Sequence, residues 1–110
     1  MKIKIAILGS TGSIGKSTLD IIKRNKSKFI IELLSAKRNY KELAKQANFF
    51  NAKNVLIYNK KYYPKILKLL NKKRTKVFFG TTPIDSILPG KVDYTISAVV
   101  GIAGLKPTVE

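Results

Sequence analysis

The chain has 110 residues, 45% of them hydrophobic, which is enough for one domain with a modest core. It contains no cysteine and no histidine, which excludes disulfides, thiolate chemistry and metal sites built on either residue. Its 22 basic and 6 acidic residues give a formal net charge of +16, which indicates either a polyanionic partner or a surface coated with lysine.

The chain opens with a predicted strand, residues 2–8, which begins as an alternating pattern and ends as an apolar run. That pattern is typical of a strand that enters a sheet at its edge and ends buried. Because the strand begins directly after the first residue, we expect no signal or transit peptide.

A glycine-rich turn follows, with Gly9, Gly12 and Gly15 at every third position. A nucleoside-triphosphate P-loop needs a glycine five residues before the Gly-Lys pair, and that position is Ser10. The spacing is instead a variant of the dinucleotide-binding turn, whose amides face a phosphate at the N-terminus of a helix. We therefore expect the amides of residues 11–14 to contact a pyrophosphate.

Helices and strands then alternate along the chain. The first helix is expected to bury Ile14, Thr18, Ile21 and Ile22 and to end near residue 24. The further predicted elements are strands at 29–35, 54–58, 76–79 and 93–100, and helices at 40–50, 63–70 and, briefly, from 82. This order predicts an α/β fold with a doubly wound, mostly parallel sheet and helices on both faces, which is Rossmann-like.

The second strand ends in a basic segment. Folds that bind NAD commonly place an acidic residue about 20 residues beyond the glycine turn, where it bonds the ribose 2′-hydroxyl. Here Lys37 and Arg38 stand in that neighbourhood, and cations favour a 2′-phosphate, so the segment predicts NADPH rather than NADH. The structural alternative is that both are solvated loop charges and that Asn39 only caps the helix that follows.

Two further features separate the dinucleotide turn from the P-loop. P-loop proteins usually hold Mg²⁺ with an aspartate at the end of a hydrophobic strand, and Asp93 lies at the beginning of the last predicted strand. That strand leads into residues 98–104, where Gly101 and Gly104 leave room for a cofactor at the carboxyl ends of the strands, or form a plain turn. The P-loop stays open as a minor alternative.

Residues 105–110 look like the first turn of another helix. Because a complete dinucleotide-binding domain has about six strands, we expect residues 1–110 to be an incomplete NADPH-binding domain of a longer polypeptide.

Two separated motifs resemble the 1-deoxy-D-xylulose 5-phosphate reductoisomerase family. They are ILGSTGSIG with STLD after it, residues 7–15 and 17–20, and AVVGIAGL followed by PT, residues 98–105 and 107–108. The resemblance spans the chain but covers only the N-terminal cofactor domain of the family. It implies an enzyme of the methylerythritol phosphate route to isoprenoids, in which a ketose phosphate is rearranged at a divalent metal (Mg or Mn) and then reduced by NADPH.

The resemblance also implies the site residues. The family's cofactor turn maps onto Thr11, Gly12, Ser13 and Ile14, and its second cofactor segment, usually Ala-Gly-Lys-Asn, maps onto residues 36–39. Lys37 stands where glycine is usual and Arg38 where lysine is usual. The binding residues expected in the second segment are therefore Lys37, Arg38 and Asn39.

The resemblance places the family's metal carboxylates, substrate residues and lid beyond position 110. We therefore expect these 110 residues to bind NADPH without turning over substrate, and the full-length enzyme to be a cytoplasmic homodimer that acts on a sugar phosphate. No membrane and no specific nucleic acid is expected as a partner. A basic nucleic-acid-binding module stays an alternative, although only three of the basic residues are arginine and no reader motif is present.

Overall fold

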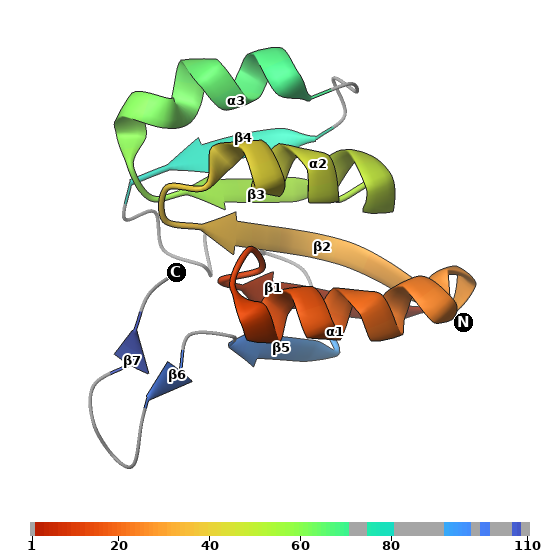
Figure 1. Cartoon of the computed structure of the whole chain (residues 1–110). Coiled ribbons are helices and arrows are strands. Elements are labelled where there is room, and N and C mark those ends of the chain that lie inside the picture. The colour runs from red at the N-terminus through yellow and green to blue at the C-terminus, as the bar shows by residue number, and fades with distance from the viewer. Residues whose placement is uncertain (1, 71–74, 81–91, 98–99, 102–106, 109–110) are drawn as a thin grey trace.

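The structure is a computed structural model that describes residues 2–70, 75–80, 92–97, 100–101 and 107–108 (Figure 1). The strands are β1 (Ile3–Leu8), β2 (Phe29–Ala36), β3 (Asn54–Ile57), β4 (Lys76–Phe79), β5 (Tyr94–Ser97), β6 (Val100–Gly101) and β7 (Pro107–Thr108). The α-helices are α1 (Ser13–Arg24), α2 (Tyr40–Phe50) and α3 (Tyr63–Leu69), with short 3-10 turns η1 (Lys26–Lys28) and η2 (Lys60–Tyr62).

Five strands form one parallel sheet in the order β4-β3-β2-β1-β5 (Figure 1). The chain moves outward from β1 to β4 and then returns to place β5 on the other side of β1. This reversal creates a topological switch point between β1 and β5, where ligands bind in open α/β sheets. The predicted α/β class with a doubly wound parallel sheet is confirmed.

The three described helices pack on one face of the sheet. Their buried residues join alternate residues of β1, β2 and β3 in the main core, whose largest fully buried members include Ile7, Leu34 and Ile57. A smaller cluster around Ala6, Leu33 and Leu56 covers the other face. The sequence also predicts helices on the other face, but the helix predicted from residue 82 lies outside the described residues.

Helix α1 buries Ile22 as predicted, but its buried face is rotated away from Ile14 and Ile21. Gly15, Leu19 and Ile22 are buried, whereas Ile14 and Ile21 are 45% and 62% exposed. Both sets have helical spacing, so periodicity alone does not choose between them. The choice follows from Gly15, because only a residue without a side chain fits where the helix touches the preceding turn.

This difference predicts unequal stability effects on α1. We expect Leu19→Ala to lower the free energy of unfolding by about 2–5 kcal/mol, because it removes a buried side chain. We expect Ile21→Ala to change it by less than about 0.5 kcal/mol, because that side chain is mostly in water. Urea unfolding of both variants checks the assignment, and equal losses would contradict it.

Two elements predicted for the last part of the chain differ from those in the structure. The strand expected over 93–100 begins one residue later, as β5 at Tyr94, and is described as far as Ser97; Val100 belongs to β6, and residues 98–99 lie outside the described part. The expected helical turn at 105–110 is wrong at Pro107 and Thr108, which form β7 and pair antiparallel with β6. A proline biases its preceding residue towards extended backbone, and a single helical turn does not offset the cost of its own nucleation.

Candidate functional site

The glycine turn lies at the carboxyl end of β1, at the switch point of the sheet. Gly9 has a φ of 75°, in the left-handed region that glycine adopts without strain. A Cβ atom on Gly15 would lie 2.5 Å from the Ser10 Cα atom and 2.6 Å from the Gly9 carbonyl oxygen. Helix α1 therefore sits directly against the turn at Gly15.

The N-terminus of α1 is open to an anion. Gly12 is the N-cap residue and provides no side-chain cap, and the first turn contains no acidic residue. Helix geometry leaves the N–H groups of Ser13, Ile14 and Gly15 without intrahelical acceptors. Gly12 has extended backbone with φ −80° and ψ 178°, which any residue adopts, so its missing side chain matters for access. The arrangement suits a phosphate group.

The four residues predicted in the turn fall together in space. Thr11 is 8% exposed and Gly12 is partly exposed, while Ser13 and Ile14 are exposed at the start of α1. The Gly12 N–H already donates to the Gly9 carbonyl at 3.2 Å, so the open helix end presents the amides of Ser13, Ile14 and Gly15 rather than all four predicted amides.

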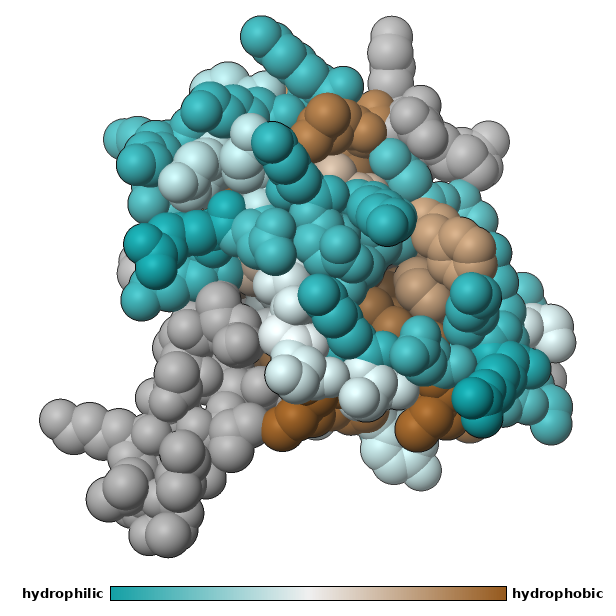
Figure 2. All heavy atoms as spheres, viewed as in Figure 1, coloured by the Kyte–Doolittle hydropathy of each residue, from teal (hydrophilic) through white to brown (hydrophobic). Residues whose placement is uncertain are grey.

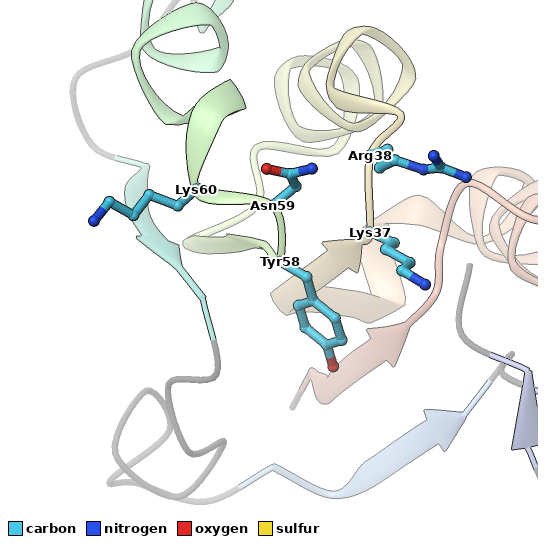
Figure 3. A pocket seen from close by; sticks show the side chains of 5 residues that line it. All are labelled: Lys37, Arg38, Tyr58, Asn59 and Lys60. Atoms are coloured by element: carbon cyan, nitrogen blue, oxygen red, sulfur yellow. The ribbon is translucent and has the colours of Figure 1, made fainter.

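The basic segment lies at the carboxyl end of β2, beside the end of β3. Lys37 and Arg38 line a pocket of about 490 Å³ together with Tyr58, Asn59 and Lys60 (Figure 3). Figure 3 shows Lys37 and Arg38 extending from β2 towards the side of the glycine turn, while Lys60 points the other way. Among the described residues, the pocket lining carries three cations and no acid, so it suits a phosphate ester.

Main-chain hydrogen bonds fix the floor of this pocket. The Tyr58 N–H donates to the Ala36 carbonyl at 3.0 Å, and the Asn59 N–H donates to the Lys37 carbonyl at 3.1 Å. The two strand ends are therefore joined, although Lys37 and Arg38 keep exposed side chains that are available to a ligand.

Asn39 caps α2, as the structural alternative predicted. Its Oδ1 atom accepts a hydrogen bond from the Glu42 N–H at 3.4 Å. The cap uses the side-chain oxygen, which leaves the amide NH₂ group of Asn39 outside the cap. The role of Asn39 in cofactor binding remains a prediction.

The P-loop alternative finds no support in the arrangement of charges. Asp93 lies at the amino end of β5, where its Oδ2 atom accepts from the Lys4 N–H at 2.8 Å. It therefore joins the amino ends of β1 and β5, at the opposite edge from the glycine turn. Within the described ranges, no three acidic residues come together as a possible metal site.

Two parts of this region were not predicted from the sequence. The first is the contribution of Tyr58, Asn59 and Lys60, for which the only signal was that neighbouring parallel strands end at the same edge. The second is the pair Ser35 and Gln46, both buried and bonded to the turn. The second glycine segment is described only at Val100 and Gly101, in β6, and its other residues lie outside the described part.

The helical face of the molecule is largely hydrophilic. Figure 2 shows hydrophilic residues spread over most of that face, with smaller hydrophobic areas between them. None of the helices in the described ranges has the length and apolar character needed to cross a bilayer.

The parallel sheet, the glycine turn and the basic pocket together define a dinucleotide-binding α/β protein. A family model described as 1-deoxy-D-xylulose 5-phosphate reductoisomerase matches residues 5–110. The chain belongs to the 1-deoxy-D-xylulose 5-phosphate reductoisomerase family.

Individual relatives agree with this assignment. The reductoisomerase of Pelagibacter ubique is 45% identical over 109 residues, which cover 97% of this chain and 28% of that protein. The enzyme of the Wolbachia symbiont of Culex pipiens is 39% identical over 97% of this chain and 27% of its own length. The chain thus spans little more than a quarter of the curated relatives that it matches.

Solved structures of the same enzyme share the fold. The Zymomonas mobilis reductoisomerase in complex with NADPH superimposes with a TM-score of 0.83 and 33% identity, over 92% of this chain and 27% of that one. A reductoisomerase in complex with NADPH, fosmidomycin and magnesium gives a TM-score of 0.78 and 27% identity, over 90% and 25% of the two chains.

Proposed function

We propose that residues 1–110 form the NADPH-binding domain of a 1-deoxy-D-xylulose 5-phosphate reductoisomerase. The observation that carries the proposal is the open N-terminus of α1 beside a pocket lined by Lys37 and Arg38. The full enzyme would convert 1-deoxy-D-xylulose 5-phosphate to 2-C-methyl-D-erythritol 4-phosphate. NADPH supplies the hydride for the reduction when it is bound.

The residues of this chain bind and orient the cofactor. The amides of Ser13, Ile14 and Gly15 are suited to the pyrophosphate, because they point from the positive end of a helix dipole. Gly12 keeps that approach clear. Thr11 shapes the start of the turn, where it is largely buried.

At the other end of the cofactor, Lys37 and Arg38 are suited to the 2′-phosphate, and Asn39 lies next to them at the start of α2. A 2′-hydroxyl offers no charge to these cations, so the pocket discriminates against NADH. Lys37 brings a side chain to a position where glycine is usual in the family, which adds a second cation to the pocket.

The metal, the substrate and the oligomeric state belong to the full-length enzyme. The divalent metal (Mg or Mn) and the sugar-phosphate substrate would bind residues that lie in the other three quarters of the relatives' length. A cytoplasmic homodimer without a membrane or specific nucleic-acid partner is the form that the family resemblance favours, and the absence of cysteine is compatible with that compartment.

A calorimetric titration of the purified 110-residue chain with NADPH, NADH and Mg·ATP, at about 0.15 M salt, tests this proposal. We expect NADPH to bind at least about tenfold more tightly than NADH, because of charge-assisted bonds to the 2′-phosphate. Binding of Mg·ATP without a preference for NADPH would instead support a P-loop protein. DNA binding that persists at this salt concentration would support the nucleic-acid module.

An assay of the same chain tests its catalytic capacity. With 1-deoxy-D-xylulose 5-phosphate, NADPH and Mg²⁺ present, we expect no loss of NADPH absorbance. Turnover by the 110 residues alone would overturn the assignment of the substrate and metal residues to the remainder of the enzyme.

A further inference from the structure

A buried polar cluster lies directly beneath the glycine turn. It consists of Ser10, Ser35 and Gln46, which are 0%, 2% and 6% exposed. They come from the turn, the end of β2 and the middle of α2. Polar side chains are buried at this level only when their hydrogen bonds are satisfied, so each bond in the cluster constrains the turn.

Ser35 holds the beginning of the turn. Its Oγ atom accepts a hydrogen bond from the Gly9 N–H at 2.9 Å, and its carbonyl oxygen accepts one from the Ser10 N–H at 2.8 Å. Two successive amides of the turn are therefore bonded to the neighbouring strand, and only Thr11 and Gly12 separate them from the open amides at the start of α1.

Gln46 holds the turn at two points. Its Oε1 atom accepts from the Ser10 hydroxyl at 2.7 Å, and its Nε2 atom donates to the Ser10 carbonyl at 2.9 Å. A neutral amide provides both an acceptor and a donor. A carboxylate lacks the donor and an aliphatic side chain lacks both groups. Of the three, only an amide can make both hydrogen bonds to Ser10.

Helix α2 links this contact to the basic pocket. Its N-terminus is capped by Asn39, directly after Lys37 and Arg38, and Gln46 lies two turns further along the same helix. We infer that Gln46 is a positioning residue that fixes the glycine turn relative to the Lys37–Arg38 pocket, so that one cofactor reaches both. The inference rests on the proposed function, since it names how that site is held.

The first test is Gln46→Leu. We expect its affinities for NADPH and NADH to fall by the same factor, about tenfold or more, because the displaced turn serves both cofactors. In the free protein, the Gly9 and Ser10 amide protons should exchange with solvent faster than in the wild type, relative to the protection of core amides. Unchanged affinity in a folded Gln46→Leu protein would overturn the inference.

The second test uses Gln46→Glu and keeps the inference falsifiable if Gln46→Leu does not fold. A protonated carboxyl group has one donor and one acceptor, like the amide, whereas the carboxylate lacks the donor. Burial raises the pKa of a carboxyl group introduced at this position. Gln46 also lines a groove between α1 and α2. The charged groups in the lining of that groove are Lys16, Asp20 and Lys23 of α1 and Glu42 and Lys45 of α2.

We therefore expect the NADPH affinity of Gln46→Glu, divided by that of the wild type at the same pH, to rise several-fold from about pH 8 to about pH 5.5. Dividing by the wild-type value removes the titration of the NADPH phosphate itself. Asn48→Asp is the matched control, since the Asn48 amide lies on α2 but donates to the Leu69 carbonyl at 3.0 Å, away from the turn. Its ratio should stay flat.

A flat ratio for Gln46→Glu would overturn the inference. The proposed function fails separately, if the wild-type chain does not bind NADPH. In that event the hydrogen-exchange comparison still tests whether Gln46 holds the turn, because it needs no ligand.

Discussion

Replacing Gly15 with alanine is expected to abolish tight NADPH binding and to destabilise the chain by about 1–3 kcal/mol, the usual cost of overpacking. The added Cβ atom would lie 2.5–2.6 Å from atoms of the Gly9 and Ser10 backbone, which have no rotamer to move out of the way. Either α1 or the turn must shift, and both carry the expected pyrophosphate site. Denaturant unfolding and NADPH titration of Gly15→Ala measure the two effects.

Gly80→Ala is the matched control for this substitution. Gly80 follows β4 with a φ of 75°, and a Cβ atom there would meet no atom of the described residues within 4 Å. We expect it to cost about 1–2 kcal/mol of stability through backbone strain alone, with NADPH affinity unchanged. If Gly15→Ala and Gly80→Ala affected NADPH binding equally, the close approach at Gly15 would have no particular role in the site.

Replacing Arg38 with alanine is expected to remove most of the preference for NADPH. A charge-assisted hydrogen bond contributes about 1.5–3 kcal/mol, so the Kd for NADPH should rise about 10- to 100-fold. The Kd for NADH should change little, because NADH has no 2′-phosphate. Parallel calorimetric titrations with the two cofactors measure the change in their ratio.

Arg24→Ala controls for the general loss of a positive charge. Arg24 is exposed in the last turn of α1, at the end of the helix that lies away from the glycine turn. In a chain of net charge +16, a non-specific electrostatic effect would weaken NADPH binding in both variants alike. Equal losses would contradict a specific contact between Arg38 and the 2′-phosphate.

Local patterns predicted most of the element positions. Helix α2 and strand β4 occupy the predicted residues, and α2 begins after Asn39 because that side chain caps it. Elements of this kind have their own signals in the sequence, namely a cap, an apolar period or a proline, and do not depend on distant contacts.

Three features of the fold and the site depend on contacts between distant segments and were not predicted from local sequence patterns. The buried face of α1 depends on the contact of Gly15 with the turn, which periodicity does not encode. Gln46 reads as an ordinary polar helix residue until α2 is placed against Ser10, and only then does its burial acquire a reason. Likewise, Tyr58 and Lys60 join Arg38 in one pocket only because β2 and β3 are neighbours.

The most direct measurement is an amide NMR titration of the ¹⁵N-labelled chain with NADPH and, separately, with NADH. We expect both cofactors to shift the amides of residues 11–15, at the start of α1, and NADPH additionally to shift those of Lys37, Arg38 and Asn39. Shifts that avoid the glycine turn, or identical shifts from the two cofactors around Arg38, would contradict the assignment of the pyrophosphate and 2′-phosphate sites.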